Sequence, residues 1–281
     1  MNQETSRGEV FRQLHARTGL FAIPNPWDAG SAKILAALGF EALATTSAGF
    51  AYSVGKPDGE GALDRDETLA NAKSIVDATP LPVSADLENG FGDTPEACAR
   101  TITMAAGIGL AGGSIEDATG RDTDPIYPFA LALERVSAAV QAARTLPSPF
   151  VLTARAENLI HGRLDLPDTI RRLEAFAAAG ADVLYAPGLK RIEDIATVVR
   201  AVAPKPVNVV MGLSGPSFSL DQLAAVGVKR VSLGSSLARA AYSAFLHAAR
   251  EIRETGTFDF AAQTTPYAEF NALFKRAGDA R

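Results

Sequence analysis

Short apolar runs alternate with segments of helical length along most of the chain, and this alternation restricts the fold more than any other feature of the sequence. Eight runs have the length and composition of buried strands, and they span residues 20–24, 42–46, 83–86, 113–116, 150–154, 183–186, 207–210 and 230–233. Helical segments span residues 29–38, 64–78, 95–106, 130–144, 167–179, 192–202, 220–226 and 235–253. Such alternation favours parallel strands joined by right-handed crossovers.

Eight β/α units in about 230 residues predict an α/β fold of the (β/α)8 TIM-barrel type, as one domain over residues 1–281. The barrel proper spans about residues 20–253, with a helix at 5–17 ahead of it and a tail helix at about 265–278 after it. A doubly wound open sheet is the alternative. Four glycines stand where helices should stop, because glycine readily adopts the left-handed conformation that ends a helix: Gly39, Gly107, Gly180 and Gly227.

Composition and charge exclude several classes of protein. Apolar residues make up 47% of the chain and the formal net charge is −5, with no cluster of lysine or arginine, so we expect no nucleic-acid surface. A single cysteine, Cys98, excludes an internal disulfide and fits a reducing compartment. The N-terminal region lacks the apolar core of a signal peptide, and no apolar run is long enough to span a membrane. We therefore expect a cytoplasmic protein.

Two acids stand at the end of the strand expected at residues 83–86. Asp86 and Glu88 are two positions apart, and in an extended chain that spacing points both carboxylates to the same side. Gly90 and Gly92 allow a sharp turn before the next helix. Oxygen ligands at such a junction suit a hard divalent cation. On spacing alone, a helix-capping acid next to a solvated acid is an equally good interpretation.

Further polar residues follow the ends of other strands, where a barrel enzyme carries its catalytic groups. Those ends supply Ser47, Ala48, Gly49 and Asp58 after the second strand, Glu116 after the fourth, Arg155 after the fifth and Asn208 on the seventh. Acids from three successive strands, together with one arginine, predict a metal site for an anionic substrate.

The stretch Asp86-Leu87-Glu88-Asn89-Gly90-Phe91-Gly92 resembles the D-x-D-[ST]-G-[YF]-G motif of the isocitrate lyase / phosphoenolpyruvate mutase superfamily. Supporting stretches occur in the family's order, as PWDAGSA at 26–32, TSAG at 46–49, KPD at 56–58, SIED at 114–117, TAR at 153–155 and AGAD at 179–182. The resemblance extends from residue 24 to about residue 240, which is most of the chain.

The resemblance implies a barrel that binds Mg2+ or Mn2+ together with a 2-oxo or 2-hydroxy carboxylate. By position in the motifs, Asp86 would bind the metal directly, while Glu88, Glu116 and Asp58 would hold it through water molecules. Family members are usually tetramers that exchange a C-terminal helix, so we expect a homotetramer of this kind.

The same resemblance implies how the substrate is held. Arg155 would bind a substrate carboxylate, and Asn208 would assist from the seventh strand. Trp27, just after the first strand, forms either a wall of the pocket or part of the packing. Arg155, Glu116 and Ser47 are the residues we expect to act in catalysis. Backbone N–H groups would face the developing negative charge at Ser47, Ala48 and Gly49.

Three departures from the family pattern concern proton transfer. The lyase branch carries a K-[KR]-C-G-H loop after the fourth strand, whereas residues 118–128 here read ATGRDTDPIYP, with no Cys, His or Lys. The lysine- and asparagine-bearing loop of the mutase branch is also missing, and the lyase glutamate after the sixth strand is replaced by Ala186-Pro187-Gly188. Tyr127 and His161 are the remaining polar candidates for proton transfer. Each could donate a proton. The alternative for Tyr127 is a packed aromatic side chain, and the alternative for His161 is an ordinary surface residue.

The sequence therefore predicts a Mg2+-dependent lyase that cleaves a carbon–carbon bond of a small 2-oxo or 2-hydroxy di- or tricarboxylate through a stabilised enolate. A decarboxylase of an oxaloacetate-like acid is the first alternative, because water can protonate the enolate that remains. A barrel that binds a 2-oxo acid without turnover is a further alternative, and phosphorus–carbon chemistry on phosphonopyruvate is a weaker one.

Overall fold

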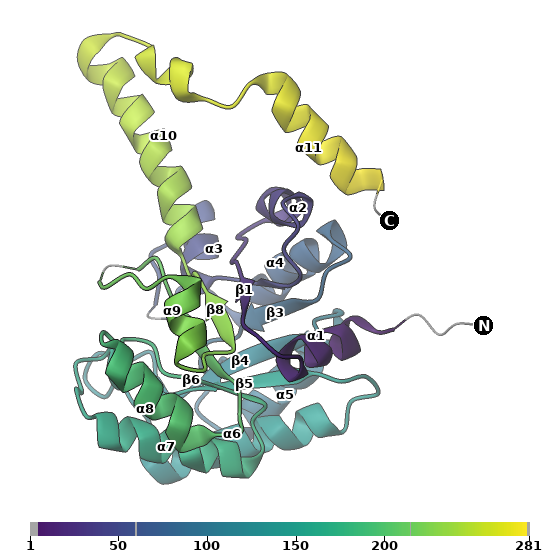
Figure 1. Cartoon of the computed structure of the whole chain (residues 1–281), viewed down its shortest axis with the longest axis vertical. Coiled ribbons are helices and arrows are strands. Elements are labelled where there is room, and N and C mark those ends of the chain that lie inside the picture. Colours follow the sequence, from purple (N-terminus) through teal and green to yellow (C-terminus); the bar gives the residue numbers. More distant parts are fainter. Residues whose placement is uncertain (1–4, 60, 214, 280–281) are drawn as a thin grey trace.

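Among the residues that the structure describes, 5–59, 61–213 and 215–279, eight parallel strands form a ring with helices outside it (Figure 1). The structure is a computed structural model. In chain order the strands are β1 (Phe21–Ile23), β2 (Leu43–Ala44), β3 (Val83–Asp86), β4 (Gly112–Glu116), β5 (Val151–Arg155), β6 (Val183–Tyr185), β7 (Val207–Val210) and β8 (Arg230–Ser232). Around the ring they follow the order β1-β8-β7-β6-β5-β4-β3-β2.

The ring is nearly closed. The described strands β1 and β2 share no ladder, but the Ala44 N–H donates to the carbonyl oxygen of Pro24, just past β1, at 3.0 Å. The last strand pairs with the first, with Phe21 opposite Arg230, which an open doubly wound sheet would not allow. The barrel prediction is therefore confirmed, and each of the eight predicted strands is present.

The helices follow the strands in alternation. They are α1 (Arg7–Ala16), α2 (Ala29–Ala37), α3 (Ser47–Ser53), α4 (Arg65–Ala78), α5 (Pro95–Gly107), α6 (Phe129–Arg144), α7 (Leu166–Ala179), α8 (Ile192–Val202), α9 (Leu220–Ala225), α10 (Ser236–Thr255), the 3-10 helix η1 (Asp259–Gln263) and α11 (Tyr267–Asp279). Asp64 illustrates why they begin where they do. Its side chain accepts from the Glu67 N–H, and the Glu67 side chain accepts from the Asp64 N–H, so two unpaired amides are satisfied at once.

Two features of the helices differ from the sequence prediction. Residues 47–53 were expected to be loop but form α3, which Thr46 caps by accepting from the Gly49 N–H. Gly107 was expected to end its helix in the left-handed conformation, but it is the last residue of α5, and Gly109 takes the positive φ of +91° instead. The expected role of glycine is confirmed at Gly180, which caps α7 with a φ of +107°.

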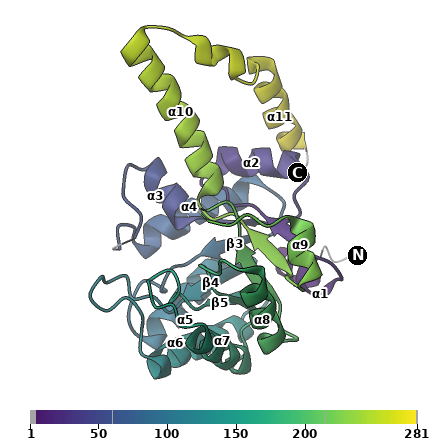
Figure 2. The ribbon, with the colours of Figure 1, turned by 60° about the vertical axis from the view of Figure 1, so that its left-hand side comes forward.

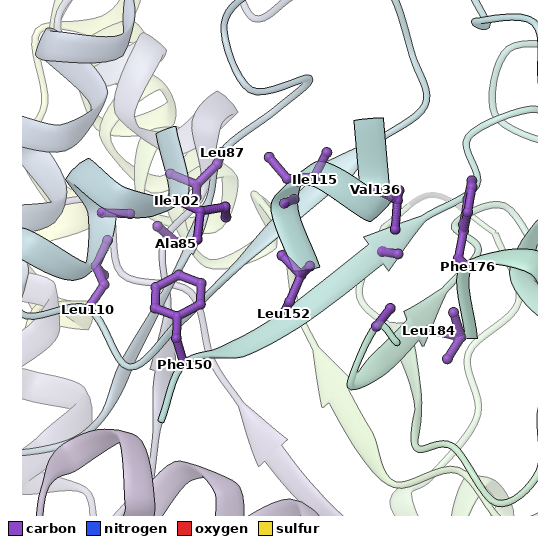
Figure 3. Close-up of a cluster of buried hydrophobic side chains, with 14 of the residues drawn as sticks. Ala85, Leu87, Ile102, Leu110, Ile115, Val136, Phe150, Leu152, Phe176 and Leu184 are labelled. Carbon is purple, nitrogen blue, oxygen red and sulfur yellow. The ribbon is translucent and has the colours of Figure 1, made fainter. Parts of the chain in front are cut away.

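Apolar side chains divide into two buried clusters. The larger cluster lies between the strands and the surrounding helices, and Figure 3 shows part of it, with Ile115 and Leu152 from neighbouring strands and with Phe176 of α7 beside Val136. The smaller cluster joins Phe11 and Leu14 of α1 to residues near the strand starts, among them Phe21, Ile23, Ala111, Val151 and Val183. The N-terminal helix therefore closes that end of the barrel.

Gly112 shows how closely α1 fits. A Cβ atom there would lie 2.6 Å from the Val151 carbonyl oxygen and 2.9 Å from Cε1 of Phe11, both too close for real contacts. With one end of the barrel filled in this way, the open end is the one where the strands finish, which is where barrel enzymes carry their catalytic groups.

The C-terminal segment leaves the barrel. Figures 1 and 2 show α10 projecting outward and α11 returning to pack on α2. Ala238 is the one buried residue in α10 among those described. No helix in the described part of the chain is long and apolar enough to cross a membrane.

Replacing Phe11 by Ala should lower the free energy of unfolding by about 3–5 kcal/mol, because the change leaves a cavity beneath the barrel. Chemical unfolding followed by circular dichroism measures it. The control Leu164→Ala removes a side chain that is 81% exposed and should change stability by less than about 0.5 kcal/mol. An equally small effect at Phe11 would show that α1 contributes little to the closure of the barrel.

Candidate active site

One arginine lies at the centre of the polar end of the barrel. Arg155, the last residue of β5, donates from Nη1 to Asp86 Oδ1 at 2.9 Å and from Nε to Glu157 Oε1 at 2.8 Å. Its Nη2 lies 3.1 Å from Glu116 Oε2. Parallel register explains the meeting, because Glu116 at the end of β4 is the partner of Arg155 on β5. All four side chains are largely buried, so the charges interact with little screening by water.

Asp86 makes further hydrogen bonds to residues on or just after the neighbouring strands. Ser47 Oγ donates to its Oδ2 at 3.1 Å, and Ser114 Oγ lies 3.4 Å from its Oδ1. The backbone N–H of Asp86 donates to Thr45 Oγ1 at 3.0 Å. These contacts fix the carboxylate at the mouth of the barrel.

Six of the ten predicted site residues line one cavity of about 1020 Å³. They come from four different connections between strands and helices, and they are Ser47, Asp58, Asp86, Glu88, Glu116 and Arg155. The structure therefore brings together the four acids, the arginine and the serine that the sequence placed at the strand ends.

Negative charge in this cavity exceeds positive charge, and the pKa values of the acids show it. Burial and then the neighbouring Asp86 and Asp58 carboxylates raise the pKa of Glu88 to about 7. Burial and Asp86 also raise the pKa of Asp58. The pKa of Glu116 is raised well above its usual range by burial, which the nearby Arg155 charge offsets only in part. A cation placed among these carboxylates would offset both the free-energy cost of burying their charges and their mutual repulsion.

The donor set suits a hard divalent cation. Its members are carboxylate oxygens, with the Ser47 hydroxyl beside Asp86, and such ligands favour Mg2+ or Mn2+. No three acidic, histidine or cysteine side chains among the described residues already converge on one point as direct ligands. Mg2+ usually keeps several water molecules and is bound through one or two carboxylates.

Four predicted residues do not line the cavity. Gly49 is buried in α3, where its N–H donates to Thr46, and a Cβ there would lie 3.1 Å from Trp27 Cβ. Ala48, in the same helix, is buried too. Asn208 is buried on β7, where it donates to Ser232 Oγ and accepts from Arg230. Their roles in substrate binding, and that of Trp27, stay predictions.

Sequence reasoning assigned no role to Glu157, which lines the cavity and accepts from Arg155. The signal was present, because Glu157 follows Arg155 by two positions at a strand end. Asp117 turns the other way and pairs with Arg172 at 3.0 Å.

The two proton-transfer candidates differ in position. His161 lines the cavity. Tyr127 is buried outside it, and its hydroxyl donates to Asp93 Oδ1 at 2.5 Å. Burial and this bond raise the pKa of Tyr127 to about 12, so the phenol holds its proton firmly.

Known proteins resemble this chain over nearly its whole length. The family model described as phosphoenolpyruvate phosphomutase matches residues 11–253. A 2-methylisocitrate lyase from Salmonella typhimurium is 30% identical over 265 residues, which cover 90% of this chain and 86% of the lyase. A candidate lyase/mutase of Burkholderia cenocepacia J2315 has a crystal structure that is 60% identical, with a TM-score of 0.92 and 95% of each chain covered.

A structure of oxaloacetate acetylhydrolase in complex with oxalate is 29% identical, with a TM-score of 0.86, and covers 96% of this chain and 94% of its own. The matched span thus includes the whole barrel and residues 86–92. This chain belongs to the phosphoenolpyruvate mutase / isocitrate lyase superfamily.

Proposed function

We propose that this protein is a Mg2+- or Mn2+-dependent enzyme that cleaves a carbon–carbon bond in a small 2-oxo or 2-hydroxy di- or tricarboxylate through an enolate. The observation that carries the proposal is one cavity lined by four acids and Arg155, in which Arg155 pairs with Asp86 and Glu116 and negative charge is in excess. Asp86 would hold the cation directly, with Glu88, Glu116 and Asp58 acting through water. When bound, the cation supplies positive charge that stabilises an enolate oxygen.

Arg155 supplies the anchor for a substrate carboxylate. Its planar guanidinium presents N–H groups in a fork that matches two carboxylate oxygens, and burial strengthens those bonds. In this structure the fork is shared among three protein carboxylates. Asp86 and Glu116, which would hold the cation, would then share less of the Arg155 charge, and Arg155 N–H groups could donate to a substrate carboxylate.

Ser47 and Ala48 would add hydrogen-bond donors at the start of α3. First-turn N–H groups of a helix have no acceptor within the helix, so they can face an anion. Gly49 fits this role less well than the sequence indicated, because its N–H already donates to Thr46. Ser47 also offers its hydroxyl beside Asp86.

Hydrolysis or decarboxylation of an oxaloacetate-like acid is the second candidate. It is favoured by the loop at residues 118–128, which brings no Cys, His or Lys to the cavity and whose Tyr127 is committed to Asp93. Neither reaction needs a strong acid from this loop, because water can protonate the product enolate. The similar acetylhydrolase acts, by its name, on oxaloacetate.

A substrate panel separates these reactions. Purified protein with Mg2+ is incubated with oxaloacetate, 2-methylisocitrate, 2,3-dimethylmalate and phosphonopyruvate, and products are followed by NMR. We expect cleavage of a carbon–carbon bond in at least one acid, lost in Asp86→Ala. Oxalate with acetate marks hydrolysis, pyruvate with CO2 marks decarboxylation, and succinate with pyruvate marks methylisocitrate cleavage. Binding without products, or turnover of phosphonopyruvate alone, would contradict the proposal.

Replacing Asp86 by Ala should abolish Mg2+ binding measured by calorimetry, because the direct ligand is lost. Asp66→Ala removes an exposed acid from the rim of the same cavity and should leave affinity unchanged. Protons compete with the cation for Glu88, so wild-type affinity should fall as pH drops through about 7. Glu88→Gln should make the Mg2+ affinity less dependent on pH. Equal affinity in Asp86→Ala and Asp66→Ala would defeat the assignment.

Replacing Arg155 by Lys should weaken oxalate binding about tenfold or more in the presence of Mg2+, because an ammonium lacks the planar fork. Competition calorimetry measures the change, and thermal melting checks that the fold persists. Arg12→Lys, on the exposed face of α1, is the matched control. Unchanged oxalate affinity would remove Arg155 from the substrate site.

A homotetramer that exchanges its C-terminal helix remains our expectation for the assembly. It is supported by the exposed apolar side chains of α10, such as Phe245 at 71% exposure, which a second copy of the chain would cover. A cytoplasmic location also remains an expectation, in line with the buried, unpaired Cys98.

A further inference from the structure

The backbone that follows Asp86 adopts a conformation that side chains rarely allow. Glu88 has a φ of +47° and Phe91 a φ of +57°, and neither is glycine. Left-handed backbone at such residues is energetically unfavourable, and it persists only where the surroundings fix it. Gly90, with a φ of +79°, lies between them. Something outside this loop must therefore hold residues 88–92 in place.

Every carbonyl oxygen of residues 88–92 has a donor. The Glu116 N–H donates to the Glu88 carbonyl at 3.0 Å, which ties the loop to β4. The remaining four carbonyls accept from side chains of the surrounding helices. Arg135 of α6 donates to Asn89 O and, at 2.6 Å, to Gly92 O; Arg65 of α4 donates to Gly90 O at 3.2 Å and to Phe91 O at 3.1 Å.

Arg135 is buried beside the loop. It is 1% exposed, and its guanidinium lies 4.0 Å from the centre of the Tyr127 ring. Its two terminal nitrogens each donate to one carbonyl, and these carbonyls are three residues apart, a spacing that the planar fork of a guanidinium can span. Arg65 is oriented by its Nε, which donates to Thr101 Oγ1 at 2.7 Å. Thr101 itself donates to Gly90 O at 2.8 Å.

In the described part of the chain, neither arginine forms an ion pair with an acid. Across the described residues, no carboxylate oxygen lies within 4.0 Å of Arg65 or Arg135 nitrogens, unlike Arg155 or Arg172. Two guanidinium groups in or near the interior are thus devoted to backbone carbonyls of one five-residue loop. Charged donors form stronger hydrogen bonds than neutral ones, which suits a loop held against its conformational preference.

We propose that Arg65 and Arg135 are positioning residues, a clamp that fixes residues 88–92 so that the Glu88 carboxylate faces the cavity beside Asp86. The consequence for metal binding rests on the proposed function, whereas the ordering of the loop does not. Arg135 does not line the cavity; Arg65 does line it, and we assign it the same positioning role. Their effect passes through the backbone of Glu88, whose N–H lies 3.4 Å from Asp86 Oδ1.

The clamp is tested with Arg135→Met, Arg135→Lys and Arg65→Met, and with Arg7→Met as the matched control. Arg7 also donates to a backbone carbonyl, that of Val76 at 3.0 Å, but this carbonyl lies outside residues 88–92. Hydrogen exchange of the metal-free protein reports on peptides spanning residues 86–93. Calorimetry gives the Mg2+ affinity, and thermal melting reports on the whole fold.

We expect exchange in residues 86–93 to rise about tenfold or more in Arg65→Met and Arg135→Met, because each loses two charged hydrogen bonds. Mg2+ affinity should fall in the same two variants and recover in part in Arg135→Lys, whose ammonium can still reach one carbonyl. Arg7→Met should leave both quantities at wild-type values. If Arg135→Met does not fold, Arg65→Met tests the clamp, because the Arg65 side chain is only partly buried.

Wild-type exchange in residues 86–93 of folded Arg65→Met, or a rise spread evenly over all peptides, would overturn the clamp. If the wild-type protein binds no Mg2+, the proposed function fails, and the exchange result still judges the clamp by itself. Faster exchange with unchanged Mg2+ affinity would overturn the link from the clamp to Glu88.

Discussion

One buried guanidinium shares its N–H groups with three carboxylates, and the organisation of the site depends on this contact. Arg155 binds Asp86, Glu116 and Glu157, yet one positive charge cannot balance them together with Glu88. Burial, and then this imbalance, raises the pKa of Glu88 to about 7. Such a balance of charge favours a divalent cation over a further anion, and under the proposed function Arg155 would then bind an organic acid.

The barrel creates this situation by geometry. Parallel strands of matched register deliver one polar residue each to the same rim, while α1 fills the opposite end around Phe11. The excess of like charge works against folding, so other contacts must hold the acids in place. Strand ladders do so for Asp86 and Glu116, and the clamp of Arg65 and Arg135 would do so for the loop.

Much of this could be predicted from the sequence, because its signals are local. Buried strands of a parallel barrel are short apolar runs, and their ends converge by topology, so the grouping of Asp86, Glu116 and Arg155 followed from the pattern. Helix α3 was missed, because seven residues around Gly49 carry too little periodicity to distinguish a helix from a loop. The bonds of Arg135 could not be foreseen, because their acceptors are backbone carbonyls more than forty residues away.

A crystal structure with Mn2+ and oxalate examines the central claim most directly, because the anomalous signal of manganese locates the ion without assumptions. We predict one manganese peak in contact with an Asp86 oxygen, with Glu88, Glu116 and Asp58 around it at water-mediated distance and oxalate in contact with Arg155. A peak at another place, or Arg155 still bound to all three carboxylates with manganese and oxalate present, would contradict the account.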